Sequence, residues 1–263
     1  MRVVASIQVR MGSERLPGKV MQSIGGKPMV GYLIGRLQHC DSLDDVGVAT
    51  GFSESNNVIQ EFCEAAKIMC FRGPDEDVLG RLLESLQYFE ADIGVVVYGD
   101  NPLIDPRIVD EMVRLFKESK SYDWVGNDLK TTFPAGMEVE VFTVSALADS
   151  ARRARDKKIR EHGTLFMRKS PSRYKLLNVE ASGIRRRPDV CLGIDTPVDA
   201  AVVEEIVESF GGDDRFSLEE ILSFLDKNPE IAKKNEDVPR RWRPYRGESE
   251  NMKRFLDRIP DKR

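Results

Sequence analysis

An apolar run near the start of the chain reads Val3-Val4-Ala5-Ser6-Ile7-Gln8-Val9, and the loop after it reads Arg10-Met11-Gly12-Ser13-Glu14-Arg15-Leu16-Pro17-Gly18-Lys19. The run has the composition of a buried strand, and the next helix is predicted to begin near Lys27 or Pro28. A basic loop with glycines between a strand and a helix is a common place for a bound polyanion. We therefore expect a phosphate-bearing ligand at the end of this first strand.

The residue types in this loop suit phosphate. Gly12 and Gly18 allow the backbone to turn sharply and to approach a ligand closely, while Arg10, Arg15 and Lys19 supply positive charge. The competing interpretation is a solvated surface loop that happens to be basic. The loop is not a Walker motif, because five residues separate its glycines and an apolar residue follows the lysine, and the chain contains no GxGxxG fingerprint.

Strands and helices alternate outward from this loop. Strands are predicted over residues 46–50, 68–72, 93–98, 122–125 and 138–142, and helices over residues 28–40, 56–67, 77–89 and 106–119. The run over residues 93–98 is rich in β-branched side chains, as in a central strand that is covered on both faces. This alternation predicts an α/β sheet.

The pattern is looser beyond residue 130. A loop over residues 131–137 leads into the strand at 138–142, where acidic and apolar residues alternate as in a half-exposed strand. The later predicted elements are helices over 145–154, 159–169 and 197–210, strands over 174–179 and 190–194, and a helix from a capping box at Ser217 to about Lys227.

The composition is that of an ordinary soluble protein of 263 residues. The net charge of −4 argues against nucleic-acid binding by the whole chain, because that function needs a broad basic surface. Residues 239–263 are an exception, with nine Lys and Arg against four Asp and Glu. We interpret this basic tail as a segment that packs on the domain or docks a second subunit.

The four cysteines show no spacing typical of a metal site, and we expect them to be reduced thiols. The first apolar run spans about seven residues, which is too short for a signal sequence or a membrane span, and no later run approaches eighteen. We expect a cytoplasmic protein without membrane or nucleic-acid partners.

Polar side chains follow several of the predicted strands. Thr50, Arg72, Asp100, Asn127 and Asp195 each come at or just after the end of a strand. Ligands of open α/β sheets bind outside the carboxyl ends of the strands, so these side chains are expected to border the same crevice as the basic loop. Phosphates, cations and paired carboxylates together imply Mg²⁺, which prefers carboxylate, water and phosphate oxygens.

Asp100 and Asp195 are the candidate metal ligands, and each has a simpler alternative. Asp100 lies in a Gly-Asp step after a buried strand and could be a turn former whose side chain bonds locally. Either Asp195 or Thr196 could cap the helix that Pro197 opens. Asp195 is therefore a metal candidate chiefly as the second carboxylate that such a site needs.

A series of short segments spans most of residues 1–230. In order they are Ile7–Val20, Gly25–Pro28, Val48–Thr50, Phe71–Gly73, Asp77–Leu79, Gly99–Pro106, Glu138–Phe142, Arg160–His162 and Asp195–Pro197. With these segments the chain resembles the spore-coat polysaccharide cytidylyltransferase family and, more distantly, the CMP-ketodeoxyoctonate and CMP-sialate synthetases. The resemblance implies a Rossmann-like α/β/α three-layer nucleotidyltransferase with a mixed, mostly parallel sheet.

The resemblance also implies an activity, the transfer of CMP from CTP to a sugar, a sugar acid or another small acidic acceptor, with Mg²⁺ and release of pyrophosphate. Arg15, Lys19 and Asp100 would be catalytic, and Asp100 and Asp195 would hold the metal. The implied nucleotide-binding residues are Gln8, Arg10, Met11, Gly12, Ser13, Arg15, Lys19, Thr50, Arg72 and Asp100.

Four residues are candidates for binding the acceptor, namely Asn101, Glu138, Glu140 and His162. Asn101 stands where spore-coat relatives often have Cys and ketodeoxyoctonate enzymes have Glu, and Gly163 replaces a usual Val, so the acceptor is expected to be unusual. The alternatives are an ordinary hydrogen-bonding role for His162 and a solvated strand face for the two glutamates.

We expect a nucleotidyltransferase domain over residues 1–212, an acceptor and dimerisation subregion over 130–180, and a helical appendage with a basic tail over 213–263. A homodimer is expected. The competing functions are a nucleotidyltransferase that uses another nucleoside triphosphate, a glycosyltransferase of similar topology, and a nucleotide-binding regulatory protein without turnover.

Overall fold

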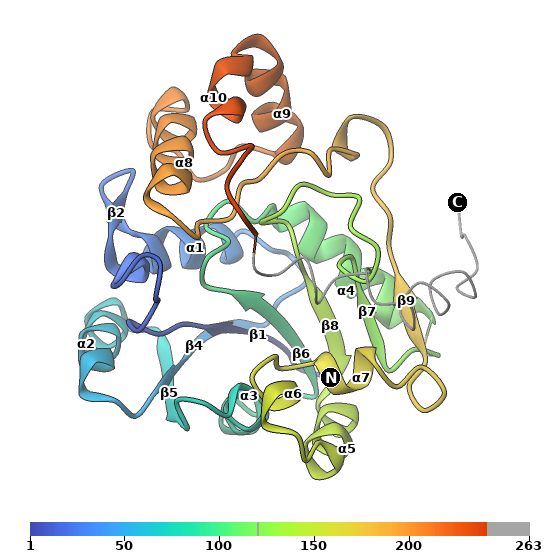
Figure 1. Ribbon diagram of the computed structural model, residues 1–263. Helices are drawn as coiled ribbons and strands as arrows, with labels where there is room; N and C mark the ends of the chain where they lie inside the picture. The colour runs from blue at the N-terminus through green and yellow to red at the C-terminus, as the bar shows by residue number, and fades with distance from the viewer. Residues whose placement is uncertain (120, 241–263) are drawn as a thin grey trace.

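A computed structural model describes residues 1–119 and 121–240 of the chain (Figure 1). The strands are β1 (Val3–Gln8), β2 (Ser23–Ile24), β3 (Lys27–Pro28), β4 (Asp45–Gly51), β5 (Met69–Gly73), β6 (Ile93–Tyr98), β7 (Trp124–Gly126), β8 (Glu140–Thr143) and β9 (Leu176–Asn178). The helices are α1 (Met29–Leu37), α2 (Asn57–Ala66), α3 (Val78–Tyr88), α4 (Pro106–Ser119), α5 (Val144–Arg153), α6 (Lys157–Arg160), α7 (Leu165–Arg168), α8 (Pro197–Ser209), α9 (Leu218–Lys227) and α10 (Pro229–Lys233).

Seven of the strands form one mixed sheet in the order β5-β4-β1-β6-β8-β7-β9. β1 lies in its interior, parallel to β4 on one side and to β6 on the other, with Val4 opposite Asp45 and Val3 opposite Ile93. β8 alone runs antiparallel to its neighbours β6 and β7. β2 and β3 pair as a separate small hairpin. The predicted mixed, mostly parallel sheet is confirmed.

The sheet is covered on both faces, which gives three layers. Alternate residues of β1 point to opposite sides, so that Val3, Ala5 and Ile7 join one hydrophobic cluster and Val4 joins the other. The first cluster includes side chains of α1, α4, α8 and α9, and the second those of α3, α5 and α7. In Figure 1, α1 and α8 lie above the sheet and α3 and α5 below it.

The predicted elements of the first half match the structure to within a few residues, but two later predictions are wrong. The segment 190–194 forms no strand, and its one sheet-like contact is an isolated bridge between Cys191 and Ala135. The helix expected over 159–169 is two short helices, α6 and α7, with Gly163 between them at a φ of 42°. A positive φ is incompatible with a continuous helix.

The appendage expected from residue 213 onward packs on the main body. α9 begins after the predicted capping box, in which Ser217 and Glu220 exchange hydrogen bonds, and Leu218, Leu222 and Ile231 belong to the first hydrophobic cluster. α10 was not predicted. Most of the basic tail, residues 241–263, lies outside the described residues.

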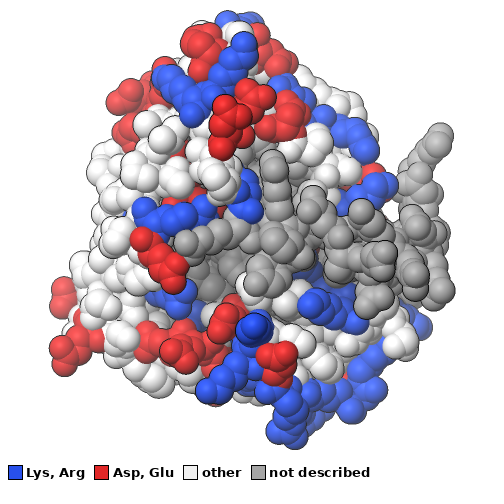
Figure 2. Space-filling model, in the orientation of Figure 1, with Lys and Arg blue, Asp and Glu red and all other residues white. Residues whose placement is uncertain are grey.

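Charged side chains of both signs are interspersed on the face shown in Figure 2, and Lys and Arg gather at its lower end over α5 and α6. Arg152 and Arg153 lie in the last turn of α5, and Lys157 and Lys158 lie in α6. Among the described residues, no helix has both the length and the apolar character required to cross a bilayer.

Candidate active site

The loop after β1 folds back on itself at the carboxyl end of the strand. The backbone N–H groups of Ser13 and Gly18 both donate to the carbonyl of Met11, at 2.9 and 3.0 Å. Gly18 has a φ of 71°, a left-handed conformation that glycine adopts without strain, and Lys19 follows at the start of a short 3₁₀ turn. The two predicted glycine positions therefore differ, because the turn depends on Gly18, whereas a Cβ on Gly12 would meet nothing within 4 Å.

Lys19 joins the two carboxylates predicted to hold a metal. Its Nζ lies 3.3 Å from Asp100 Oδ2 and 3.6 Å from Asp195 Oδ1, and it donates to the carbonyl of Ile194 at 2.6 Å. The Arg15 guanidinium lies 2.8 Å from Asp195 Oδ2. Residues from three distant parts of the chain thus converge at one point, although Asp195 does not follow a strand as was predicted.

Asp195 reaches this point because the segment before it, residues 190–194, runs outside the sheet. The N–H of Ile194 donates to the carbonyl of Asp100 at 2.8 Å, and the N–H of Leu192 donates to Ala135 at 2.7 Å. Gly136 makes this close approach possible, since its φ is 101° and a Cβ there would lie 2.6 Å from the backbone nitrogen of Gly193. The segment predicted as a strand is instead a connector that carries Asp195 to Asp100.

The choice between Asp195 and Thr196 as helix cap is decided by the structure. The Thr196 side chain accepts from the N–H of Asp199, and the Asp199 carboxylate accepts from the N–H of Thr196, which completes a capping box at the start of α8. Asp195 is therefore not the cap, and its carboxylate is directed to Arg15 and Lys19.

The two carboxylates fit Mg²⁺ in their chemistry and convergence, since both lie within 4 Å of one atom, the Lys19 nitrogen. Among the described residues, no group of three or more His, Cys, Asp and Glu side chains gathers as a metal site. A metal at Asp100 and Asp195 would therefore complete its coordination with phosphate and water oxygens, as Mg²⁺ commonly does.

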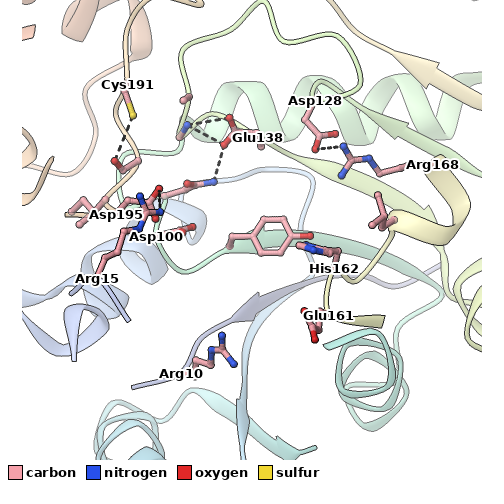
Figure 3. A pocket seen from close by; sticks show the side chains of 17 residues that line it. Arg10, Arg15, Asp100, Asp128, Glu138, Glu161, His162, Arg168, Cys191 and Asp195 are labelled. Atoms are coloured by element: carbon pink, nitrogen blue, oxygen red, sulfur yellow. Dashed lines mark hydrogen bonds and ion pairs between the residues drawn. The ribbon is translucent and has the colours of Figure 1, made fainter. Parts of the chain in front are cut away.

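These residues border a cavity of about 770 Å³ (Figure 3). Its lining residues are Arg10, Arg15, Tyr98, Asp100, Asn101, Asp128, Ala135, Gly136, Glu138, Glu161, His162, Leu165, Arg168, Cys191, Gly193, Ile194 and Asp195. A second cavity of about 390 Å³ lies on the side of the basic loop and includes Gln8, Ser13, Lys19 and Arg81. The two cavities share Arg10, Tyr98 and Asp100 among other residues, so they form two adjoining compartments.

Most of the predicted nucleotide-binding residues line these compartments, but four do not. Met11 and Gly12 belong to the loop without lining either cavity, and Thr50 is buried in β4. The Arg72 guanidinium donates five hydrogen bonds, three of them to the carbonyls of Gly51, Phe52 and Ser53. Arg72 therefore orders the turn after β4, and the structure does not bring it to the cavity.

Glu138 and Glu140 are buried, which corrects the prediction of a half-exposed strand. Glu138 lines the larger cavity, and its carboxylate accepts from the backbone N–H of Gly136 and from Asn101 Nδ2 at 3.1 Å. Glu140 lies behind the cavity, where Trp124 Nε1 donates to it at 2.8 Å and the Thr164 hydroxyl also donates. Burial, with a smaller effect of neighbouring Asp128, raises the pKa of Glu140 to about 7.

His162 and Asn101, two of the residues predicted to bind the acceptor, line the larger cavity. His162 also lines the loop-side compartment, so it stands at their junction. Burial lowers the pKa of His162 below its ordinary value, which favours a neutral imidazole at pH 7.

Sequence reasoning missed a buried ion pair in the cavity wall. Asp128 Oδ2 lies 3.0 Å from the Arg168 guanidinium, and both side chains are more than nine-tenths buried. Asp128 directly follows Asn127, which was recognised as a residue after a strand, so the adjacent carboxylate was a readable signal. Arg168 had no such signal, because it lay within a segment that was expected to be one continuous helix over residues 159–169.

A second missed residue, Arg81 of α3, supports the loop-side compartment. Its guanidinium donates to Gln8 Oε1 at 3.1 Å and to the carbonyls of Pro74 and Asp75. Burial, together with the nearby charge of Arg10, lowers the pKa of Arg81 to about 10, which still leaves it charged at pH 7. Gln8 is thereby held by a charged donor at the end of β1.

The end of the described chain also reaches the site, because the segment after α10 descends toward the centre of the molecule (Figure 1). Arg240 lies 2.9 Å from Asp199 Oδ1, and both side chains are at least nine-tenths buried. Asn235 Nδ2 donates to the same carboxylate oxygen at 2.9 Å. Residues 235–240 are called the C-terminal strap below. They pack on the Asp199 carboxylate, which belongs to the capping box of α8.

The strap contacts the basic loop as well. The carbonyl of Pro239 accepts from the Arg15 guanidinium at 3.1 Å, while the same guanidinium pairs with Asp195. Arg15 is consequently positioned from two sides. The basic tail was predicted either to pack on the domain or to dock a second subunit. Arg240, near its start, packs on the domain.

Comparisons with known proteins agree with this geometry. A family model described as cytidylyltransferase matches residues 4–236. The spore coat polysaccharide biosynthesis protein SpsF of Bacillus subtilis is 30% identical, with 88% of this chain and 96% of that protein covered. The 3-deoxy-manno-octulosonate cytidylyltransferase of Escherichia coli is 34% identical over a shorter region, 43% of this chain and 45% of that protein.

A cytidylyltransferase from Leptospira borgpetersenii has a solved structure that superimposes with a TM-score of 0.85 at 29% sequence identity, covering 91% of this chain and all of that one. The family match extends over the basic loop, Asp100, Asp195 and α8. The chain therefore belongs to the cytidylyltransferase family, as a CTP-dependent nucleotidyltransferase.

Proposed function

We propose that this protein transfers CMP from CTP to an oxygen of a small acceptor and releases pyrophosphate, with Mg²⁺ as cofactor. The observation that carries the proposal is the convergence of Arg15, Lys19, Asp100 and Asp195 at the junction of two compartments. Phosphoryl and nucleotidyl transfer depend mainly on positioning and charge neutralisation, and this junction offers both cations and carboxylates.

The nucleotide occupies the loop-side compartment in this proposal. Arg15 and Lys19 exchange their carboxylate partners for the oxygens of the β- and γ-phosphates when CTP enters, and Ser13 lies beside them in the same wall. Asp100 and Asp195, released from the two cations, hold Mg²⁺. Bound there, Mg²⁺ would supply charge neutralisation at the phosphates and would acidify an acceptor hydroxyl.

The acceptor occupies the larger compartment, beside Asn101, Glu138 and His162. Its oxygen attacks the α-phosphorus, a new phosphorus–oxygen bond forms, and the bond to the β-phosphate oxygen breaks in line. The hydroxyl proton passes from the acceptor to water, and the electron pair of the broken bond departs with pyrophosphate. Arg15 and Lys19 stabilise the charge that builds on this leaving group.

The product is a CMP-activated small molecule. The name of the Bacillus subtilis relative places that protein in polysaccharide biosynthesis. By analogy we propose that the acceptor here is a sugar or sugar derivative, which fits a cavity of about 770 Å³ whose lining includes Asn101, Glu138 and His162.

The thermal unfolding midpoint tests the choice of nucleotide. A ligand that binds the folded state raises the midpoint, by an amount that corresponds to about 2.7 kcal/mol at a concentration 100 times its Kd. We expect CTP with Mg²⁺ to raise it, and UTP, ATP, GTP and dTTP to raise it less. A larger rise with another nucleotide would contradict the assignment of CTP, and no rise with any nucleotide would count against the proposed nucleotide site.

A further inference from the structure

The loop-side compartment extends from one face of the sheet to the other around the end of β1. Lys19 marks its first end, and this lysine donates to the carbonyl of Ile194, whose side chain belongs to the first hydrophobic cluster. Gln8 and Arg81 mark its second end, on the face that α3 covers. If the triphosphate binds at Lys19 as proposed, the ribose carries the base toward this second end.

The Gln8 side chain is fixed in one orientation at the second end. Arg81 Nε lies 3.1 Å from one of its amide atoms, and Ser6 Oγ lies 3.0 Å from the other. An arginine nitrogen can only donate a hydrogen bond, so the amide atom beside Arg81 must be the oxygen, Oε1. The amide nitrogen, Nε2, therefore faces Ser6.

Two buried hydroxyl groups fix the nitrogen side of the amide. The Ser85 hydroxyl donates its single proton to the carbonyl of Leu82 at 2.9 Å. The 2.9 Å hydrogen bond between the hydroxyls of Ser6 and Ser85 must therefore run from Ser6 to Ser85, which leaves the Ser6 oxygen to accept from Gln8 Nε2. Rotating the amide by half a turn would set Nε2 against the Arg81 guanidinium and would lose both hydrogen bonds. The carboxamide is thus held in one orientation.

Half of the hydrogen-bonding capacity of this carboxamide is left for a ligand. A carboxamide has two N–H donors and two acceptor lone pairs, and among the described residues Ser6 uses one donor and Arg81 one lone pair. The fixed amide thus offers a donor beside an acceptor in a set order. Cytosine presents the complementary pair, an acceptor at ring N3 beside an amino donor at N4, whereas uracil presents a donor at N3 beside an acceptor at O4. A freely rotating amide would suit both bases, but a fixed one suits only one of them.

We infer that Gln8 reads the base of the nucleotide, an inference that rests on the proposed function. Its Nε2–H donates to N3 of cytosine, and its Oε1 accepts from the N4 amino group. Arg81 and Ser6 are positioning residues, which hold the amide in the orientation that matches cytosine. Uracil in the same place would set its N3–H against Oε1 only if the amide were reversed, so its polar groups stay unmatched and its affinity falls. The other role open to Arg81 is a direct contact to a phosphate, since it lines the same compartment.

The experiment measures the Kd of the full chain for CTP, UTP and 3-deaza-CTP by isothermal titration calorimetry with Mg²⁺ present. 3-Deaza-CTP carries a C–H group in place of ring N3, so it tests the proposed hydrogen bond by itself. We expect the wild-type protein to bind CTP at least about tenfold more tightly than either analogue. Gln8→Leu replaces the carboxamide by an apolar group, and its Kd values for the three nucleotides should lie within about threefold of one another.

Three further variants complete the test. Gln8→Glu guards against a folding defect in the leucine variant, because a glutamate can keep the contact to Arg81 but has no N–H to donate, so the preference for CTP over 3-deaza-CTP should again be lost. Arg81→Met should weaken the preference as well, because the amide is then free to rotate. Gln87→Leu is the matched control, since Gln87 is an exposed residue of α3 outside both cavities, and it should bind all three nucleotides as the wild type does.

Equal binding of CTP and 3-deaza-CTP by the wild type would overturn the inference and leave the proposed function standing, because CTP is still bound. A folded Gln8→Leu protein that keeps the full preference for CTP would do the same. An equal rise of all three Kd values in Arg81→Met, with the preference intact, would show that Arg81 binds a phosphate and does not position Gln8. Binding of none of the nucleotides by the wild type would count against the proposed function itself.

Discussion

The Asp100→Asn variant is expected to transfer CMP about 10²–10³-fold more slowly than the wild-type protein, with little change in the free energy of unfolding. The Asp100 side chain is 37% exposed, and its ion pair in the structure is with Lys19, so the fold does not depend on it. In the proposed reaction, however, its charge is needed for Mg²⁺, and an amide is a weaker ligand than a carboxylate. Pyrophosphate release measures the loss of rate, and thermal unfolding measures stability.

The Asp41→Asn variant is the matched control, because it removes a negative charge from an exposed aspartate outside the two cavities. It should keep its activity. A rate for Asp100→Asn within about threefold of the wild type would remove Asp100 from the mechanism. A large loss of stability would instead show that Asp100 has a structural role that its contacts do not reveal.

Arg240→Ala is expected to lower the free energy of unfolding by about 3–5 kcal/mol, because it leaves the buried Asp199 carboxylate without its cation. The same change should raise the KM for CTP by about tenfold, since the C-terminal strap contacts Arg15 through Pro239. Chemical denaturation measures the first effect, and steady-state kinetics at a temperature where the variant remains folded measure the second.

Two further variants separate positioning from general destabilisation. Arg215→Ala removes an exposed arginine whose ion pair with Asp213 spans 4.0 Å, and it should change neither quantity. Arg240→Lys should recover part of the stability, because a lysine still supplies positive charge to Asp199. An Arg240→Ala protein with unaltered KM for CTP would show that the strap stabilises the fold without positioning the nucleotide site.

The first half of the fold was predictable because its signals are local. The run from Ile93 to Tyr98 is apolar throughout, as a central strand must be, and glycines and prolines mark the ends of its neighbours. In the second half, tertiary contacts override local pattern. Residues 190–194 look like a strand, but their hydrogen bonds go to Asp100 and Ala135, which are more than fifty residues away in sequence.

The strand β8 illustrates a related difficulty. Acidic and apolar residues alternate from Glu138 to Phe142, and that alternation normally marks one solvated face. Here the acidic face is buried, because Trp124, Thr164 and Asn101 donate hydrogen bonds to the two glutamates. None of these donors is close to the strand in sequence, so only the folded chain shows that the face is satisfied without water.

The residues of the candidate site also fall into two groups, those that a local sequence pattern indicates and those that only tertiary packing brings together. The basic loop is a contiguous segment with a recognisable composition, and Asp100 and Asp195 follow recognisable sequence steps. Packing of α7 brings Arg168 to Asp128, and packing of the C-terminal strap brings Arg240 to Asp199, and no spacing in the sequence indicates either pair. Arg72 is the opposite case. A cation directly after a strand suggested phosphate binding, but the Arg72 guanidinium donates hydrogen bonds to the backbone carbonyls of Gly51 and Phe52.

The fate of the α-phosphorus of CTP tests the central claim most directly. The protein is incubated with Mg²⁺ and with a low-molecular-mass extract of the cells that produce it, which supplies the acceptor. CTP labelled with ³²P at either the α or the γ position is added, and the products are separated. The account predicts that the α label appears in a new CMP-linked compound and that the γ label appears in pyrophosphate. Recovery of the γ label on the acceptor, or of the α label only in free CMP, would contradict it.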